Sequence, residues 1–225
     1  MIRFDSVCKT YPGSQGGLRN ISLEIISGEM VFLTGHSGAG KSTLLKLIGL
    51  LEQVSKGQLW VNQINLKQLP AAYIPYHRRQ VGMIFQDHRL LPDRTVFDNV
   101  ALPLVVAGFS HNEIRRRTQA ALDKVGLLNK ARSFPLTLSG GEQQRVGIAR
   151  AVVRKPPIVL ADEPTGNLDP DLSQEIMSLF DQFNQVGVTL LIATHDLDLI
   201  RPMNKRILTL HQGQLTGDRP SHEPA

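Results

Sequence analysis

The chain has 225 residues, of which 41% are apolar, one cysteine and a net charge of +5. A single cysteine excludes a disulfide framework, and the longest apolar run, residues 100–109, is too short for a membrane-spanning helix of ~20 residues. The first residues lack the apolar run of a signal peptide, so we expect a cytosolic protein. The basic charge is scattered apart from Arg115–Arg117, which predicts a solvated helix face and no direct binding of nucleic acid.

The first third of the chain alternates short apolar segments with turns. The pattern predicts one helix, at 41–52, and strands at 1–7, 21–25, 30–35, 58–62 and 80–85. Between about residues 87 and 135 the strands stop and the pattern becomes helical. One helix there begins with Ser110 and Glu113 in the spacing of a capping box, and carries the three arginines.

Alternation returns after residue 140. The pattern predicts helices at 141–154 and from Pro170 to Gly187, and buried strands at 158–162 and 188–194. Near-continuous apolar strands between amphipathic helices indicate an α/β fold with a mostly parallel sheet covered on both faces. We expect a single domain, in which residues 1–86 and 156–215 form the core, 87–155 form a helical subdomain and 216–225 are a loose tail.

The segment GHSGAGKST follows one predicted strand and opens a helix. Its G-x-x-x-x-G-K-S pattern is that of a phosphate-binding loop, in which glycines let backbone N–H groups converge on phosphate oxygens. Lys41 supplies a positive charge to the terminal phosphates, and the Ser42 hydroxyl can ligate Mg²⁺. The residues assigned to nucleotide binding here are Gly35, His36, Ser37, Gly38, Ala39, Gly40, Lys41, Ser42 and Thr43.

Three polar residues come at the ends of two buried strands. Asp162 ends the strand at 158–162, Glu163 follows it, and His195 follows the strand at 188–194. The carboxyl ends of parallel strands line the ligand crevice of such a sheet. Two adjacent carboxylates can divide the chemistry there, one on the metal and one on the attacking water. We therefore expect Asp162 to hold Mg²⁺, Glu163 to polarise water and His195 to contact the γ-phosphate.

A second glycine-rich helix start, LSGGEQQR, stands at residues 138–145. Ser139 precedes two glycines and a charged helical run, which indicates another anion-binding helix N-terminus. The pattern leaves open whether this helix faces the chain's own phosphate-binding loop or that of another chain.

These elements, with IVLADEP at 158–164 and THD at 194–196, have the order and spacing of ATP-binding cassette (ABC) ATPases. The sequence resembles that family over nearly its whole length. The resemblance implies an ABC fold with an N-terminal antiparallel β part, ATP hydrolysis with Mg²⁺, and a head-to-tail homodimer. In such a dimer the LSGGEQQR element, called the signature, completes the nucleotide site of the partner subunit.

The resemblance also assigns roles to individual residues. It places Tyr11 against adenine, Gln86 on Mg²⁺ and the attacking water, and Glu163 as the general base. The expected catalytic residues are Lys41, Gln86, Glu163 and His195, and the expected metal ligands are Ser42, Gln86 and Asp162. The resemblance assigns further nucleotide contacts, across the dimer, to Ser139, Gly140, Gly141, Glu142 and Asp169, the last in a loop with Leu168 that crosses between subunits.

Within the family the likeness is strongest to the cell-division members, through His36, GMIFQDHRLL, DRTVFDNVALPLVVAG and LDKVGLL. This implies an integral membrane partner, a place on the cytoplasmic face of the bacterial inner membrane at the division site, and control of peptidoglycan hydrolysis. Division-ring proteins are further candidate partners. Leu90, Leu91 and Phe97 are candidates to line the groove that receives a helix of the membrane partner.

Other functions fit the sequence less closely. The nearest is the ATPase subunit of a lipoprotein-release or macrolide exporter, which shares the signature and differs in its membrane partner. A DNA-acting ABC ATPase fits the basic pI, but would carry a long coiled coil where this chain has about fifty residues without sustained heptads. The signature and His195 argue against a kinase or a simple nucleotide-binding module.

Overall fold

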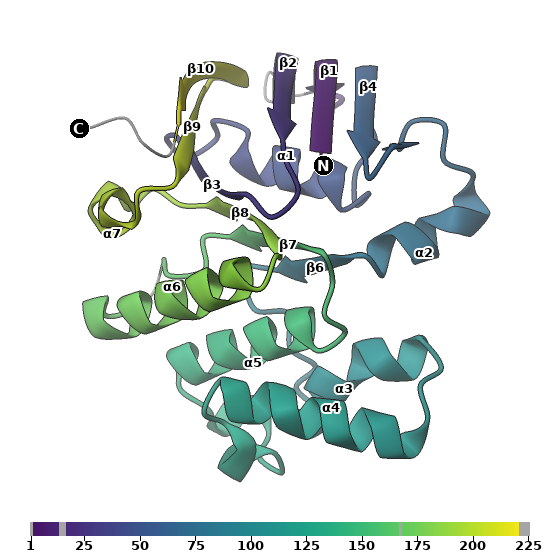
Figure 1. Ribbon diagram of the computed structural model, residues 1–225, viewed down its shortest axis with the longest axis vertical. Coiled ribbons are helices and arrows are strands. Elements are labelled where there is room, and N and C mark those ends of the chain that lie inside the picture. The colour runs from purple at the N-terminus through teal and green to yellow at the C-terminus, as the bar shows by residue number, and fades with distance from the viewer. Residues whose placement is uncertain (1, 14–16, 167, 221–225) are drawn as a thin grey trace.

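The structure, a computed structural model, describes residues 2–13, 17–166 and 168–220. Its first part is an antiparallel sheet of four strands in the order β2-β1-β4-β5 (Figure 1). The strands are β1 (Ile2–Thr10), β2 (Gly17–Ile25), β4 (Lys56–Val61) and β5 (Ile64–Asn65). Alternate side chains of β1, Ile2 and Phe4, are buried beneath the sheet, as period-two strands require.

The central sheet has six strands in the order β10-β9-β3-β8-β7-β6. They are β3 (Met30–Thr34), β6 (Val81–Ile84), β7 (Ile158–Asp162), β8 (Thr189–Ala193), β9 (Arg206–His211) and β10 (Gln214–Arg219). Every neighbouring pair is parallel except β9 and β10. The expected mostly parallel sheet and the N-terminal antiparallel part are therefore confirmed, and the carboxyl ends of β3, β7 and β8 meet at one edge.

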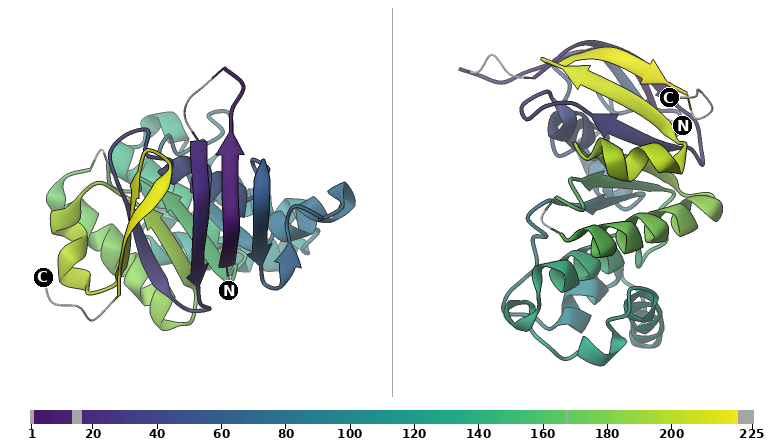
Figure 2. Two further views of the ribbon diagram at one scale, coloured as in Figure 1. Left: turned by 90° about the horizontal axis from the view of Figure 1, so that it is seen from above. Right: turned by 90° about the vertical axis from the view of Figure 1, so that its left-hand side faces the viewer.

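The helices divide between the two faces of this sheet. The α-helices are α1 (Lys41–Ile48), α2 (Ile74–Arg78), α3 (Val96–Val106), α4 (His111–Lys124), α5 (Gly140–Val152), α6 (Pro170–Gln185) and α7 (Leu197–Ile200). Four short 3₁₀ turns, Ala71–Tyr73, Leu128–Lys130, Pro135–Thr137 and Arg201–Met203, complete the connections. The antiparallel sheet lies at one end of the molecule and α3, α4 and α5 lie at the other, with the central sheet between (Figure 2). Of the helices in the described ranges, none is both long and apolar enough to cross a membrane.

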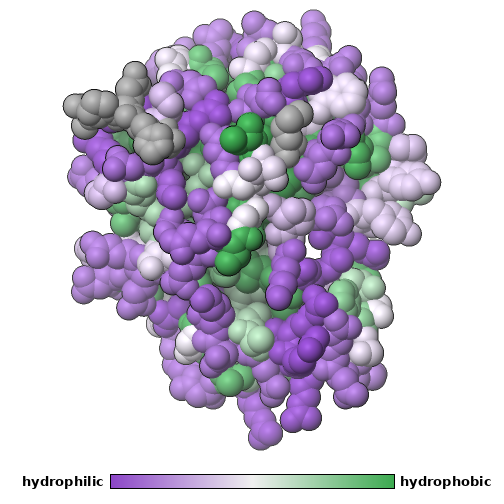
Figure 3. Space-filling model, in the orientation of Figure 1, coloured by the Kyte–Doolittle hydropathy of each residue, from purple (hydrophilic) through white to green (hydrophobic). Residues whose placement is uncertain are grey.

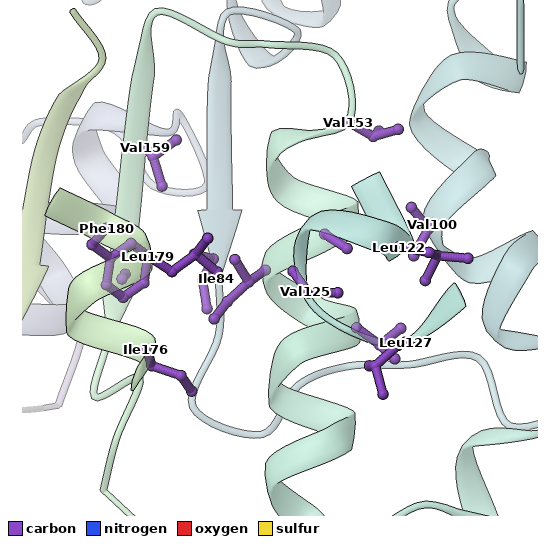
Figure 4. Packing of buried hydrophobic residues seen from close by; sticks show 14 of the residues in the cluster. Ile84, Val100, Leu122, Val125, Leu127, Val153, Val159, Ile176, Leu179 and Phe180 are labelled. Atoms are coloured by element: carbon purple, nitrogen blue, oxygen red, sulfur yellow. The ribbon is translucent and has the colours of Figure 1, made fainter. Parts of the chain in front are cut away.

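Two hydrophobic cores hold these layers together. One packs α1 between the two sheets and contains Phe4, Leu44 and Leu191. The other extends from α6 through α5 to α4; Ile176, Leu179 and Phe180 lie beside Ile84 of β6, and Leu122 lies beyond α5 (Figure 4). Fully burying one such side chain stabilises the fold by about 1.5–3 kcal/mol. The helical subdomain therefore shares continuous apolar packing with the central sheet.

The structure corrects the sequence-based prediction at the C-terminal end. The prediction of a loose tail from residue 216 is wrong for residues 216–219, which belong to β10. This strand pairs antiparallel with β9, and Arg206 donates to both carboxylate oxygens of Asp218 at 2.7 Å. Residues 221–225 of the expected tail lie outside the described residues. The helix expected at 41–52 ends at Ile48, where Gly49 is the C-cap.

The arginine-rich helix α4 has the expected N-cap and solvated face, but the Glu113 side chain completes no capping box among the described residues. The Ser110 hydroxyl accepts a hydrogen bond from the Glu113 backbone N–H at 3.4 Å. The Glu113 carboxylate pairs with Arg117 at 2.6 Å, whereas Arg115 and Arg116 are exposed to solvent. The free cysteine, Cys8, is only half-buried on β1.

Candidate nucleotide-binding and catalytic site

A cleft of about 690 Å³ lies at the carboxyl ends of β3 and β7. It collects residues from segments far apart in the sequence. Its lining residues are Tyr11, Gly17, His36, Ser37, Gly38, Ala39, Gly40, Lys41, Ser42, Thr43, Gln86, Asp162, Glu163 and His195. All of them except Gly17 were predicted as site residues. Gly17 begins β2, and no motif in the sequence marks it.

The loop between β3 and α1 has the form that a phosphate-binding loop requires. Helix α1 begins at Lys41 after Gly40, whose φ is +109°, and no side chain of the described residues caps its first turn. The first N–H groups of an uncapped helix are free to bind an anion, and the helix dipole adds to the attraction. Gly35 has φ +141°, and a Cβ atom there would lie 2.2 Å from the Leu210 carbonyl oxygen. Glycine is therefore required at the start of this loop.

Gly35 and Gly38 give a matched test of this geometry. Gly38 also has a positive φ, +77°, but a Cβ atom there would meet no atom of the described residues within 4 Å. We expect Gly38→Ala to cost about 1–3 kcal/mol from backbone strain alone. Gly35→Ala adds a backbone clash and should lower the free energy of unfolding further. Urea denaturation measures both; equal losses would contradict the steric requirement at Gly35.

Glu163 lies between Lys41 and His195 in the cleft. Its carboxylate is 3.4 Å from the Lys41 Nζ atom and 2.9 Å from the His195 Nδ1 atom. Lys41 also donates to the Gly35 carbonyl oxygen at 2.7 Å. Glu163 has φ +48°, and its N–H donates to the Ala193 carbonyl oxygen at 2.9 Å. A left-handed non-glycine residue costs of order 1–3 kcal/mol and is typical of functional sites.

Asp162 ends β7 with a carboxylate that suits a cation. Burial raises the pKa of Asp162, and a hydrogen bond with Ser42 partly opposes that shift. Its Oδ1 atom is buried and has no hydrogen-bond partner among the described residues. An unpaired buried carboxylate oxygen is costly, and a bound cation would offset the cost. Because Ser42 and Gln86 line the same cleft, the three oxygen-bearing side chains fit the ligand preference of Mg²⁺.

Two aromatic groups border the cleft. The Tyr11 hydroxyl lies 3.4 Å from the Thr43 hydroxyl, and the Lys9 ammonium lies 4.8 Å from the centre of the tyrosine ring. The His36 ring contacts the His211 ring edge to face at 5.0 Å. His211 ends β9, a strand that the sequence pattern does not predict. This contact ties the phosphate-binding loop to the β9–β10 hairpin.

The signature lies outside the chain's own cleft. Among the described residues that line the cleft, none comes from residues 138–145. The Ser139 hydroxyl accepts from the Glu142 N–H at 3.3 Å, and the Glu142 carboxylate accepts from the Ser139 N–H at 3.0 Å. Glu142 also pairs with Lys130, whose hydrogen bond is the main cause of the lowered pKa of Glu142. The capping box therefore uses the Glu142 carboxylate within its own chain.

Asp169 likewise lies away from the cleft. It is the N-cap of α6, and its carboxylate accepts a hydrogen bond from the Leu172 N–H at 3.0 Å. A Cβ atom on Gly141 would lie only 2.1 Å from the Leu172 side chain. The loop at Asp169 and the signature are therefore neighbours. Asn167, in the same loop, lies outside the described residues.

The family model described as "ABC transporter" matches residues 18–166. This chain belongs to the ABC transporter family. The ABC ATPase is 60% identical to the cell division ATP-binding protein FtsE of Escherichia coli (strain K12), over 96% of this chain and 98% of the relative. It is 45% identical to FtsE of Bacillus subtilis (strain 168), over 99% of this chain and 98% of the relative. The identification of the family from the sequence is confirmed.

Solved structures agree with this assignment. The ABC ATPase superposes with a TM-score of 0.92 on a dimeric post-hydrolysis state of the ATP-binding cassette MJ0796 bound to ADP and Pi, which is 36% identical and fully covered. It superposes with a TM-score of 0.88 on CbiO1 of Clostridium perfringens, at 27% identity over 98% of this chain and 88% of the other. The chain is therefore an ATP-binding enzyme that hydrolyses ATP to ADP and phosphate.

Proposed function

We propose that this ABC ATPase works in bacterial cell division, as a homodimer on the cytoplasmic face of the inner membrane. It binds an integral membrane protein of the FtsX type and through it controls peptidoglycan hydrolysis outside the membrane. The observation that carries the proposal is the 60% identity to FtsE over nearly the full length of both chains. The signal that it passes is the change between its ATP-bound and product-bound states.

The proposed chemistry assigns one task to each group in the cleft. Glu163, between Lys41 and His195, is positioned to polarise a water molecule for attack on the γ-phosphate. Lys41 neutralises charge on the terminal phosphates, and His195 orients the γ-phosphate and the base. The Tyr11 ring stacks on the adenine base. Ser42, Gln86 and Asp162 would hold Mg²⁺, which supplies further positive charge to the phosphates when bound.

The dimer is proposed to be head-to-tail, with each nucleotide between the loop of one chain and the signature of the other. The position of residues 138–145 outside their own cleft supports this arrangement, because a helix start with two glycines is otherwise without a ligand. Ser139, Gly140 and Gly141 would then offer a hydroxyl and N–H groups to the partner's γ-phosphate. Asp169 and Leu168 stand beside this surface. The dimeric state of the solved relatives is consistent with it.

The loop after Gln86 connects the cleft to the helical subdomain. His88 and Arg89 both have left-handed backbones, with φ of 56° and 48°. Their carbonyl oxygens accept hydrogen bonds from the Arg150 guanidinium of α5, at 2.5 and 2.7 Å. Gln86 lines the cleft and lies two residues before this clamp. A difference in what Gln86 contacts in the ATP and product states would therefore reach the signature helix directly.

The same segment presents an apolar surface for the membrane partner. Leu91 is 39% exposed, and its backbone is held by the Asn99 side chain at 2.8 and 3.0 Å. Helix α3 exposes three further apolar side chains, Leu102, Val105 and Val106. Leu90 and Phe97, also predicted to line this groove, are half-buried and pack on one side against the core of the subdomain. We assign docking of a cytoplasmic helix of the partner to Leu91 and the exposed side of α3.

Replacing Leu91 by glutamate tests this assignment. Because Leu91 is partly exposed, the variant should fold and bind ATP, while a carboxylate in an apolar contact should reduce co-purification with the FtsX-type partner by about tenfold or more. The control is Leu136→Glu, since Leu136 is 82% exposed in another part of the subdomain. If Leu91→Glu folds, binds ATP and retains the partner as well as Leu136→Glu does, Leu91 is not in the docking surface.

A further inference from the structure

A second large cavity, of about 930 Å³, lies at the opposite end of the central sheet from the nucleotide cleft. Pro157 and Val188 line it, and they directly precede β7 and β8, so it sits at the amino ends of the parallel strands. Its walls are α4, the end of α5 and the end of α6. Figure 3 shows hydrophobic surface in the hollow between α6 and the helices of the subdomain. We call this cavity the basic groove.

The floor of the basic groove is apolar. Val153 and Val159 are buried at its base, and Phe183 and Val188 are half-buried beside them. Val186, the C-cap of α6, is 78% exposed at the rim. This exposed valine and the recessed apolar floor form a hydrophobic surface, and a partner that covers it removes it from water.

Among the described residues, the rim of the basic groove carries four cations and no carboxylate. They are Arg116, Arg117 and Lys124 of α4, and Lys155 after α5. Two have partners: Arg117 pairs with Glu113 at 2.6 Å, and Lys124 donates to Gln182 at 2.7 Å. Arg116 and Lys155 are exposed and have no anionic partner in the described residues.

Nearby charges do not cancel this positive potential. Asp181 directly precedes the groove residue Gln182 in α6, and its carboxylate pairs with Lys205 at 3.0 Å. Arg154 adjoins Lys155, and its pKa is lowered first by burial and then by the charges of Arg79 and Arg117. Asp123 is exposed next to Lys124 but does not line the groove. The groove therefore combines an apolar floor with a rim that attracts anions.

We propose that the basic groove docks an acidic amphipathic segment of a partner protein. Apolar side chains of the segment pack on Val153, Val159 and Val186, and its carboxylates pair with Arg116 and Lys155. A helix or an extended segment can enter a recess between helices and cover its apolar floor. The flat surface of a bilayer would leave that floor uncovered. The groove lies at the end of the sheet opposite the nucleotide cleft, so the head-to-tail dimer proposed above, whose interface is at the cleft, would leave the groove open.

Fluorescence anisotropy with a synthetic probe tests this binding. The probe is a labelled peptide of about 18 residues, built from leucine and glutamate in helical amphipathic order, and its control has the same composition in shuffled order. With the full chain, the amphipathic peptide should bind at least about tenfold more tightly than the shuffled one, and added salt should weaken it. Equal binding of the two peptides, or no binding, overturns the proposal.

Variants of the chain locate the site. Arg116→Glu combined with Lys155→Glu should weaken binding of the amphipathic peptide by about tenfold or more, and Val186→Ser should weaken it several-fold. The matched control is Arg115→Glu, because Arg115 is exposed on the same helix but does not line the groove. Each variant should keep its ATPase rate, which reports an intact fold. An equal loss with Arg115→Glu would show unspecific attraction and overturn the assignment.

The same variants distinguish a membrane from a protein ligand. Vesicles containing phosphatidylglycerol are sedimented with the chain and with the Arg116→Glu, Lys155→Glu double variant. If the double variant loses vesicle binding while neither peptide binds, the cations of the groove serve a lipid surface and the proposal is wrong. If the peptide result holds and vesicle binding is unchanged, the groove is a protein-docking site.

Discussion

Replacing Glu163 by glutamine should lower the rate of ATP hydrolysis by about 10²–10⁴-fold and leave ATP binding intact. Glutamine keeps the shape of the side chain but cannot accept a proton. The Lys41 ammonium is also held by the Gly35 carbonyl at 2.7 Å, so the loop keeps an anchor when the carboxylate is lost. Phosphate release measures the rate, and equilibrium binding of a fluorescent ATP analogue measures the affinity.

The stalled variant should also accumulate as an ATP-dependent dimer on size exclusion, because the composite site closes and does not turn over. Glu24→Gln is the matched control, since Glu24 is an exposed glutamate of β2 that does not line the cleft. That control should hydrolyse ATP at the normal rate. Near-normal turnover by Glu163→Gln would refute the assignment of the base.

Some segments carry one local pattern that fixes both their structure and their position. The strand at 158–162 is predicted with its observed bounds, because a short apolar run flanked by Pro156, Pro157 and Pro164 indicates a buried strand. Its carboxyl end then placed Asp162 and Glu163 at the ligand edge without further information. The phosphate-binding loop was found for the same reason, since its residues are contiguous and lie between a strand and a helix.

The sequence was less informative where the partners of a segment are distant. The strands β9 and β10 were missed because their residues mix charged, polar and apolar types, and β9 depends on pairing with β3, about 175 residues earlier in the chain. His211, which contacts His36, was missed with them. The basic groove could not be predicted either, because its lining comes from several separate segments.

The orientation of the signature illustrates a further limit. The pattern of residues 138–145 predicts an anion-binding helix start, but not whose anion it binds. Only the assembled chain shows that this helix start lies outside its own cleft, beside the loop at Asp169. The Glu142 carboxylate, assigned to nucleotide by resemblance, closes a capping box and pairs with Lys130. Contacts of this kind depend on side chains that the motif does not contain.

Two variants make the proposed composite site testable. Lys41→Ala removes the ammonium from the phosphate-binding loop, and Ser139→Arg puts a bulky cation where the signature would meet the partner's nucleotide. Each homodimer then has two defective sites and should be inactive. Losing the Ser139 cap costs about 0.5–2 kcal/mol of stability, so thermal denaturation is measured first to show that both variants fold.

Heterodimers of these variants separate an arrangement between chains from one within a chain. If sites form between chains, a dimer of Lys41→Ala with Ser139→Arg has one intact site and one with both defects, and should recover roughly half the normal rate per dimer. A dimer of the wild-type chain with the double variant is the matched control, because each of its sites then carries one defect. Both heterodimers are purified through two different tags before hydrolysis is measured. Activity in the control and none in the first heterodimer would show that each signature serves its own chain.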